Sequence, residues 1–489
     1  MDFSTLNFGA PAAERDIATG LKDYFVESEA FKRVASGNKT IILGNRGSGK
    51  SAIFKILAEK ERAKKSIVLE LSPDDYSYEM LNKIMLPENR GAWAKQGAYT
   101  AAWKYLIYVL IMKKLVGDKF KFKGGVEAKI YNYLRDNHAG TQDNPISTLI
   151  SYLKRLEGIK VGTYEAAIKT KELTKLYKLE EIQNHIPSII ELCSRRKVFV
   201  LVDELDRGWD ASEDAKAFVA GLFHAAISLN QHTANLRVLV SLRRELYDSI
   251  PTLYEDVQKV RDILETISWD EPSLLELVGK RIRYSVPALK EEKDFITCWN
   301  HIFSETLDYR QSKSYNYFMD RTLYRPREII QFCTDALSVA RKENTWPINY
   351  PIISKAEIVY SEDRTKDIVA EYRFQYPGLS SVLEAFRGRS YNFDHDELEN
   401  LCLGISMGEY RIDETANWVI DQDSDYIIDT LWKIGFLRAQ AVGGVKALRR
   451  SGSSYLGPHQ VSNLNLRNIQ RFHVHPMFRS YLGMKESKG

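Results

Sequence analysis

Short apolar runs separated by polar turns predict buried strands in the first half of the chain. The runs occupy residues 40–43, 66–71, 198–202 and 236–241 and are rich in β-branched residues. Unbroken apolar runs of this length are typical of parallel strands that are covered on both faces. Apolar residues at helical spacing lie between the runs, so the pattern favours an α/β fold with a parallel sheet.

A glycine-rich loop follows the first of these strands and precedes a helix. It reads Gly-Asn-Arg-Gly-Ser-Gly-Lys-Ser at residues 44–51 and fits G-x-x-x-x-G-K-[ST], the phosphate-binding P-loop. A strand, a loop and a helix in this order aim backbone N–H groups and the positive end of the helix dipole at one point. A chance glycine loop is the alternative, and these flanks argue against it. The predicted ATP-binding residues are Gly44, Asn45, Arg46, Gly47, Ser48, Gly49, Lys50, Ser51 and Ala52.

The side chains of this loop predict how the nucleotide is held. Lys50 supplies a positive charge for the β- and γ-phosphates, and the hydroxyl of Ser51 is the expected ligand of Mg²⁺. ATP and Mg²⁺ are therefore the predicted cofactors.

Two acids end the third apolar run. Five apolar residues at 198–202 are followed by Asp203 and Glu204, which is the Walker B pattern. The carboxyl end of a buried parallel strand faces the ligand, so Asp203 is expected to hold Mg²⁺ and Glu204 to polarise the attacking water. The alternative is a surface strand that ends in acids, and a wholly apolar strand is rarely at a surface.

The helical patterns divide the chain into four predicted parts. A helical segment at 1–37 packs on the nucleotide site, and the ATPase core follows at 38–270 with a large helical insertion at about 73–195. A helical lid at 271–364 precedes a last domain at 365–489. Helices are predicted from residue 393 and over 426–437, and strands at 442–445 and 471–476. Helices followed by a β-hairpin resemble a winged-helix fold.

Taken in order, the motifs resemble a known group of proteins. The P-loop, the Asp-Glu strand, Ser-Leu-Arg-Arg from residue 241, Trp-Asp-Glu-Pro-Ser-Leu-Leu from 269 and Arg-Pro-Arg-Glu from 325 together resemble AAA+-like ATPases close to the origin-recognition and STAND groups. The chain is more closely similar to an uncharacterised bacterial P-loop ATPase family found near mobile-element and phage-defence genes. The resemblance implies an α/β core, a helical lid and ATP-dependent self-association, hence a homo-oligomer.

The resemblance also implies roles for residues outside the P-loop. Ser241 ends a strand at the position called sensor 1, and Arg327 opens a helix as a candidate sensor 2. Arg243 or Arg244 is expected to reach a γ-phosphate, in the same subunit or across an interface. The alternative is that both of these arginines are solvated at the surface.

Composition narrows the class of protein and its partners. The chain has 489 residues, of which 44% are hydrophobic and 27% charged, and the net charge is only +4. Four widely spaced cysteines read as reduced thiols of a cytoplasmic protein. The amino terminus lacks a signal-peptide pattern, and the longest apolar stretch, around 105–112, is too short to span a membrane. No membrane association is therefore expected.

Basic residues gather in the last 54 positions of the chain. Nine basic residues oppose one acid, Glu486, and they are Arg438, Lys446, Arg449, Arg450, Arg467, Arg471, Arg479, Lys485 and Lys488. This excess suggests a nucleic-acid surface. The alternative is a winged helix that contacts protein and locks the resting state. His473 and His475 favour packing roles over zinc ligation because no further Cys or His lies nearby.

These observations support one main interpretation and two alternatives. The main interpretation is an ATP-binding and ATP-hydrolysing switch that controls self-assembly or a separate effector protein, as in bacterial anti-phage defence. The first alternative is a DNA-binding ATPase of origin-recognition type that reads nucleic acid through its basic carboxyl-terminal domain. The second is a nucleotide-gated scaffold without catalysis, against which the intact Glu204 argues.

Overall fold

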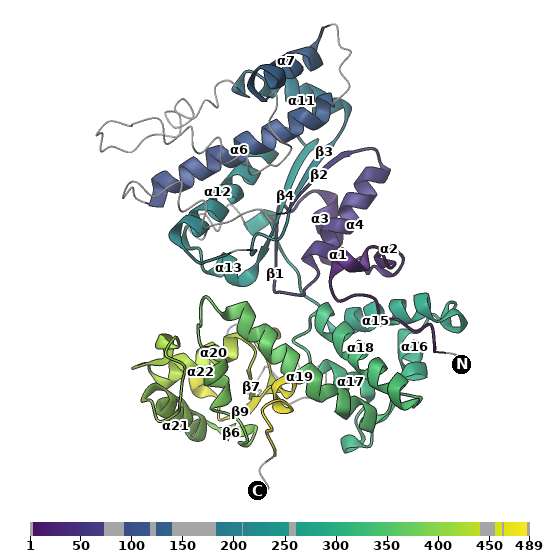
Figure 1. Ribbon diagram of the computed structural model, residues 1–489, viewed down its shortest axis with the longest axis vertical. Coiled ribbons are helices and arrows are strands. Elements are labelled where there is room, and N and C mark those ends of the chain that lie inside the picture. Colours follow the sequence, from purple (N-terminus) through teal and green to yellow (C-terminus); the bar gives the residue numbers. More distant parts are fainter. Residues whose placement is uncertain are drawn as a thin grey trace. The chain divides into compact units, whose positions relative to one another are not determined.

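The computed structural model describes residues 3–72, 92–117, 124–138, 182–207, 209–253, 261–440, 455–461 and 464–486. They fall into two compact units (Figure 1). The sheet unit comprises Glu27–Asn45 and Gly49–Ile267, and the carboxyl-terminal unit comprises Met1–Val26, Arg46–Ser48 and Ser268–Gly489. Each unit buries its own hydrophobic core.

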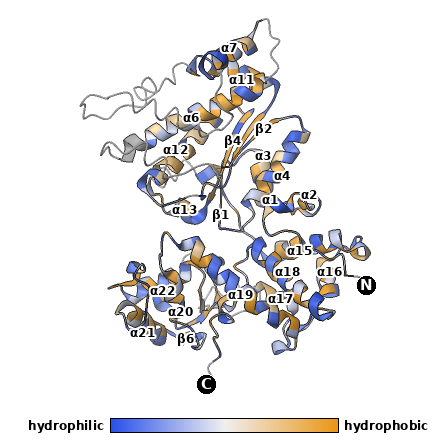
Figure 2. Ribbon diagram, in the orientation of Figure 1, coloured by the Kyte–Doolittle hydropathy of each residue, from blue (hydrophilic) through white to orange (hydrophobic). Residues whose placement is uncertain are grey.

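The sheet unit is built on five parallel strands in the order β2-β3-β4-β1-β5. Their bounds are Ile41–Gly44 (β1), Ile67–Leu71 (β2), Val198–Val202 (β3), Leu236–Arg243 (β4) and Leu264–Thr266 (β5). The four predicted strands are confirmed, and the orange colour of β2 and β4 in Figure 2 marks their apolar residues. The pairing aligns Ile67 with Val198, and Val198 with Leu236, so these strands begin side by side.

Helices in the same unit cover the sheet. They are α3 (Glu29–Ser36), α4 (Lys50–Ala63), α6 (Ala92–Val116), α7 (Val126–His138), α11 (Ile186–Arg195), α12 (Glu213–Asn230) and α13 (Arg244–Asp248). The indole N–H of Trp103 on α6 donates to the Phe218 carbonyl on α12 at 3.1 Å. A Cβ at Gly221 would lie 2.7 Å from the Cβ of Tyr99, so the close approach of these two helices requires glycine there.

The predicted helical insertion at about 73–195 is described in part. Helices α6, α7 and α11 belong to it, whereas residues 73–91, 118–123 and 139–181 lie outside the described residues. Helix α6 begins at Ala92 and contains the longest apolar stretch of the sequence. Within the described part of the chain, no helix combines the length and the hydrophobicity needed to cross a membrane.

The carboxyl-terminal unit is mainly helical. Its helices are α1 (Ala13–Asp16), α2 (Leu21–Tyr24), α15 (Glu271–Ser285), α16 (Phe295–Ile302), α17 (Ser314–Met319), α18 (Pro326–Glu343), α19 (Tyr350–Tyr372), α20 (Leu379–Glu384), α21 (His395–Ser406), α22 (Ser424–Lys433) and α23 (Pro476–Arg479). The unit also contains a small sheet in the order β6-β9-β7-β8. Its strands are β6 (Asn392–Asp394), β9 (Arg471–Val474), β7 (Leu437–Gln440) and β8 (Tyr455–Leu456).

Two features of this unit differ from the sequence-based expectation. The helix predicted over 426–437 ends at Lys433, because Gly435 adopts a left-handed φ of 82° and Leu437 already begins β7. The boundary predicted between residues 364 and 365 falls inside the continuous helix α19. The strand predicted at 471–476 is confirmed as β9, whereas the one at 442–445 lies outside the described residues.

Candidate nucleotide site

The P-loop joins β1 to α4 through two glycines in left-handed conformations. Gly47 has a φ of 80° and Gly49 a φ of 99°, which other residues rarely adopt. Helix α4 begins at Lys50, so Ser51 and Ala52 lie in its first turn. The Lys50 amine donates to the carbonyl oxygens of Gly44 at 2.6 Å and Asn45 at 3.1 Å. The charged end of Lys50 is thereby held over the loop.

Charged neighbours at the carboxyl edge of the sheet act on Lys50. Burial lowers the pKa of Lys50, while the carboxylates of Glu245 and Asp203 act in the opposite direction. Asp203 was predicted as a site residue, whereas Glu245 was not. A phosphate that entered here would add negative charge beside Lys50 and favour its protonated form.

Asp203 and Ser241 are brought together by adjacent strands. Each residue directly follows the register pair Val202 and Val240 of β3 and β4. The hydroxyl of Ser241, which is 1% exposed, donates to the Asp203 carboxylate. The Glu204 backbone N–H donates to the same carboxylate oxygen at 2.9 Å. These two bonds orient Asp203 as a metal ligand would need to be oriented.

The bond from Ser241 predicts a measurable loss of activity. Ser241→Ala should lower ATP turnover about tenfold, since a hydrogen bond to a charged group contributes about 1.5 kcal/mol and about 1.4 kcal/mol is a factor of ten in rate. Phosphate release under saturating ATP is the measurement. Ser249→Ala is the control, because that hydroxyl donates to the Leu246 carbonyl in α13 and, within the described part of the chain, to no carboxylate. Equal turnover in the two variants would contradict the role of Ser241.

Glu204 occupies a strained position beside two polar partners. Its φ of 60° lies in the left-handed region, which is uncommon for a residue with a side chain and is often found at functional sites. Its carboxylate accepts a hydrogen bond from the Ser72 hydroxyl at 2.6 Å and pairs with Arg207 at 3.3 Å. Ser72 follows β2, the neighbour of β3, so the strand order places it here.

The structure separates the two candidate arginines after β4. Arg243 forms an ion pair with Asp206 and lies 3.6 Å from Glu245, and its side chain is 20% exposed. Its positive charge also acts on Lys50. Arg244 pairs with Asp248 at 2.9 Å and is 47% exposed. Arg243 is therefore part of the charged edge around Lys50, and Arg244 is bound along the surface of α13.

Arg327 lies beside the tip of the P-loop, which belongs to the same compact unit. Its backbone N–H donates to the Gly47 carbonyl at 3.3 Å, and its Nε donates to the Pro11 carbonyl at 3.4 Å. The indole N–H of Trp269 donates to the Ser48 carbonyl at 2.8 Å. Burial lowers the pKa of Arg327, and the nearby charge of Arg46 acts in the same direction. The sequence-predicted arginine and the predicted loop therefore meet.

The groups around the loop fit a bound triphosphate. The Ser48 hydroxyl is buried and lacks a hydrogen-bond partner among the described residues. Such an orphaned donor suits an anionic ligand. Lys50 can bind phosphate oxygens, and Ser51 and Asp203 would hold Mg²⁺.

Among the described residues, the basic excess near the carboxyl terminus is partly buried and partly exposed. Arg438 is 5% exposed and pairs with Asp320 at 3.3 Å. Arg479 stands 3.8 Å from the ring of Tyr391, and burial lowers its pKa to about 9. Arg467 pairs with Asp425 at 2.7 Å but its side chain is 74% exposed, and Arg471 and Lys485 are exposed as well. Lys446, Arg449, Arg450 and Lys488 lie outside the described residues.

The helices of this region carry the opposite charge. Residues 395–433, which contain α21 and α22, include ten acids against one Arg and one Lys. A negative surface repels a phosphate backbone, so these two helices do not favour DNA binding.

His473 stacks on Tyr455, and the buried His475 accepts a hydrogen bond from the backbone N–H of Met477. The described residues hold no cluster of three or more metal-binding side chains, and both histidines have the predicted packing role.

Two segments of the chain match known protein families. Residues 7–76, which include the P-loop, match the family described as ORC-CDC6-like. Residues 272–369 match the FunZ-associated C-terminal helical domain. These residues overlap the lid predicted at 271–364, and the match ends within α19.

Three individual proteins that resemble this chain are identical to it at 29% of the aligned residues or fewer. The chain is 24% identical over 488 residues to the putative transposon gamma-delta 80.3 kDa protein of Escherichia coli K12, and it spans 66% of that protein's length. It is 29% identical over 121 residues to Allergen Alt a 2 of Alternaria alternata, which is 25% of this chain and 62% of that protein. A solved structure of Aeropyrum pernix ORC2 aligns over 96% of this chain and 95% of its own, at 11% identity and a TM-score of 0.28. The chain thus has an α/β P-loop fold whose amino-terminal segment is similar to ORC-CDC6-like proteins.

Proposed function

We propose that the protein is an ATP-binding and ATP-hydrolysing enzyme of origin-recognition type that acts on DNA. The observation that carries the ATPase assignment is the hydrogen bond from Ser241 to Asp203 at the carboxyl ends of the parallel strands. The negative charge of Asp203 also acts on the Lys50 amine. The ORC-CDC6-like match over residues 7–76 supports the origin-recognition type.

Each site residue then has a chemical task. Lys50 neutralises the phosphates, and Mg²⁺ held through Ser51 and Asp203 would stabilise charge that develops during phosphoryl transfer. Glu204 accepts a proton from, or orients, the attacking water. Arg243 and Arg327 are the candidate positive groups for the γ-phosphate, whereas the pairing of Arg244 with Asp248 makes it a weaker candidate.

The comparisons favour the DNA-binding alternative over the effector-coupled switch. An ORC-CDC6-like match and a relative described as a putative transposon protein both support DNA as the partner. Self-assembly into a homo-oligomer belongs to the same proposal. The order of α20, β6, α21, α22, β7 and β9 supports a winged-helix-like domain. A separate effector and a place in phage defence remain predictions from the sequence.

Steady-state phosphate release with and without duplex DNA tests the proposed function. We expect Mg²⁺-dependent ATP turnover of at least a few per minute at saturating DNA, and a rate that rises when DNA is added. Removal of Mg²⁺ with a chelator should abolish turnover, because the metal neutralises charge that the protein alone leaves uncompensated. Turnover that is absent under every condition would contradict the ATPase assignment, and an unchanged rate together with no DNA binding would contradict the DNA partner.

A further inference from the structure

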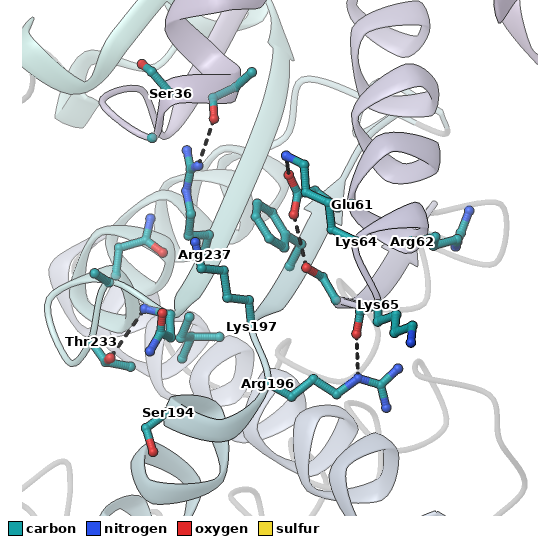
Figure 3. A pocket seen from close by; sticks show the side chains of 18 of the residues that line it. Ser36, Glu61, Arg62, Lys64, Lys65, Ser194, Arg196, Lys197, Thr233 and Arg237 are labelled. Carbon is teal, nitrogen blue, oxygen red and sulfur yellow. Dashed lines mark hydrogen bonds and ion pairs between the residues drawn. The ribbon is translucent and has the colours of Figure 1, made fainter.

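A basic pocket opens at the amino-terminal ends of the sheet's strands. It has a volume of about 1380 Å³, and all of its lining residues belong to the sheet unit (Figure 3). Seven of these residues are Lys or Arg, and one, Glu61, is acidic. The pocket lies at the edge of the sheet opposite the P-loop, because the P-loop and Asp203 follow the carboxyl ends of β1 and β3.

Strand pairing creates this concentration of charge. Lys64 and Lys65 precede β2, and Arg195, Arg196 and Lys197 precede β3, its neighbour in the sheet. The backbone N–H of Ile67 donates to the Lys197 carbonyl at 2.8 Å. The Nε of Arg196 donates to the Lys65 carbonyl at 2.7 Å, as Figure 3 shows. Two basic runs that are far apart in the sequence are thus held side by side.

Among the described residues, only some of the pocket's basic side chains form ion pairs with carboxylates. The ion pairs are Lys64 with Glu61, Arg62 with Glu70, and Arg195 with Glu127 and Glu191. Among the residues that the structure describes, no carboxylate pairs with Lys65, Arg196 or Lys197. Uncompensated like charges that are held together oppose folding, so the arrangement is the one expected where an anionic ligand supplies the missing charge.

One residue that lines the pocket, Arg237, is held in place by its neighbours. Arg237 on β4 donates to the carbonyls of Val34 at 3.0 Å and Ala35 at 3.4 Å, both on α3. It also covers the ring of Phe199, which lies 5.5 Å away. A Cβ at Gly37 would come within 3.1 Å of Arg237 Nη1, and Gly37 has a φ of 105°. The residues at this corner are therefore packed closely around the positive charge.

We infer that this pocket binds the phosphate backbone of duplex DNA, an inference that rests on the DNA partner of the proposed function. Phosphate is the anion that several clustered lysines and arginines neutralise best. Of the residues that line the pocket, Phe199 alone is aromatic, and it is 4% exposed. Single-strand binders stack bases on exposed aromatic rings, so contact limited to phosphates favours a duplex.

The pocket and the nucleotide site are separate enough to be tested independently. The five-residue strand β3 joins the two edges and spans about 16 Å at 3.3 Å per residue. Exposed lysines at the amino edge are therefore expected to affect DNA binding without affecting basal ATP turnover. This separation distinguishes failure of the inference from failure of the ATPase assignment.

The test is a salt titration of duplex binding by the Lys65→Ala/Lys197→Ala variant of the full chain. A short labelled duplex of mixed sequence is the probe, and fluorescence anisotropy is the measurement. We expect affinity to fall about tenfold at low salt, and the slope of log affinity against log salt to lose about two contacts' worth. Basal ATP turnover and the melting temperature should match those of the wild type, since both lysines are exposed.

Three comparisons decide between the possible outcomes. Lys293→Ala/Lys342→Ala removes the same charge from exposed positions elsewhere and should leave the salt slope unchanged. Wild-type affinity and slope in the Lys65/Lys197 variant would overturn the inference, most directly if Arg449→Ala/Arg450→Ala weakened binding instead. Stronger binding to single strands, or displacement of the duplex by equimolar tripolyphosphate, would also overturn it. A wild type that hydrolyses ATP but binds no DNA would overturn both this inference and the DNA partner.

Discussion

Lys50→Ala is expected to abolish tight ATP binding. The Lys50 amine is the positive charge at the start of α4, and it is held over the Gly44 and Asn45 carbonyls. Without it, the negative charges of Asp203 and Glu245 would face the phosphates with less opposition. Loss of a charge-assisted contact in a buried site weakens binding by about 3 kcal/mol or more, which exceeds a hundredfold. Isothermal titration calorimetry with ATP and Mg²⁺ is the measurement.

A second lysine on the same helix supplies the control. Lys55 pairs with Glu70 at 2.6 Å on the surface of the sheet unit, and exposed ion pairs of this kind contribute about 1 kcal/mol or less. Lys55→Ala should therefore bind ATP as the wild type does. ATP affinity within about threefold of wild type in Lys50→Ala would contradict the P-loop assignment.

Glu204→Gln is expected to keep ATP binding and to lower turnover about a hundredfold or more. The amide has nearly the shape of the carboxylate but cannot accept a proton from water, and loss of a general base typically costs this much. The Ser72 hydroxyl can still donate to the amide oxygen, so the position of the side chain should be retained. Single-turnover phosphate release and calorimetry together separate chemistry from binding. Slow hydrolysis should also prolong any ATP-bound assembly.

Glu213→Gln is the matched control for this variant. Glu213 opens α12 and its side chain is 77% exposed. It should hydrolyse ATP at the wild-type rate. A normal rate of phosphate release in Glu204→Gln would show that another group positions the water, and the Walker B role would then have to be withdrawn.

Local signals in the sequence define the candidate nucleotide site because its groups lie within short motifs. The P-loop needs glycines at fixed spacing and an adjacent strand and helix, and all of these are legible in one stretch of the chain. The partners of the motif residues were not legible. Ser72 reaches Glu204, and Asp206 reaches Arg243, only because of the order in which the strands are paired.

Counting charges along the chain could not show which of the basic residues near the carboxyl terminus are exposed. The count near the carboxyl terminus included the buried Arg438 and the half-buried Arg479, which donates to the Val474 carbonyl, together with the exposed Arg467, Arg471 and Lys485. A count cannot distinguish a buried, paired guanidinium from an exposed one. The basic pocket was not predicted, because its charges are far apart in the sequence and close together in the fold. Its two runs, at residues 64–65 and 195–197, are modest alone and become a cluster only when β2 pairs with β3.

The helix α19 has a mechanical consequence for the carboxyl-terminal unit. Its 23 residues form a rod of about 34 Å that begins beside α18 and continues past the boundary predicted at residues 364 and 365. One hydrophobic core runs from α15 to α23 along this rod. Bending a packed helix is costly. A force applied at Arg327 on α18 would therefore rotate α19 and the helices packed along it together, without a hinge near residue 364.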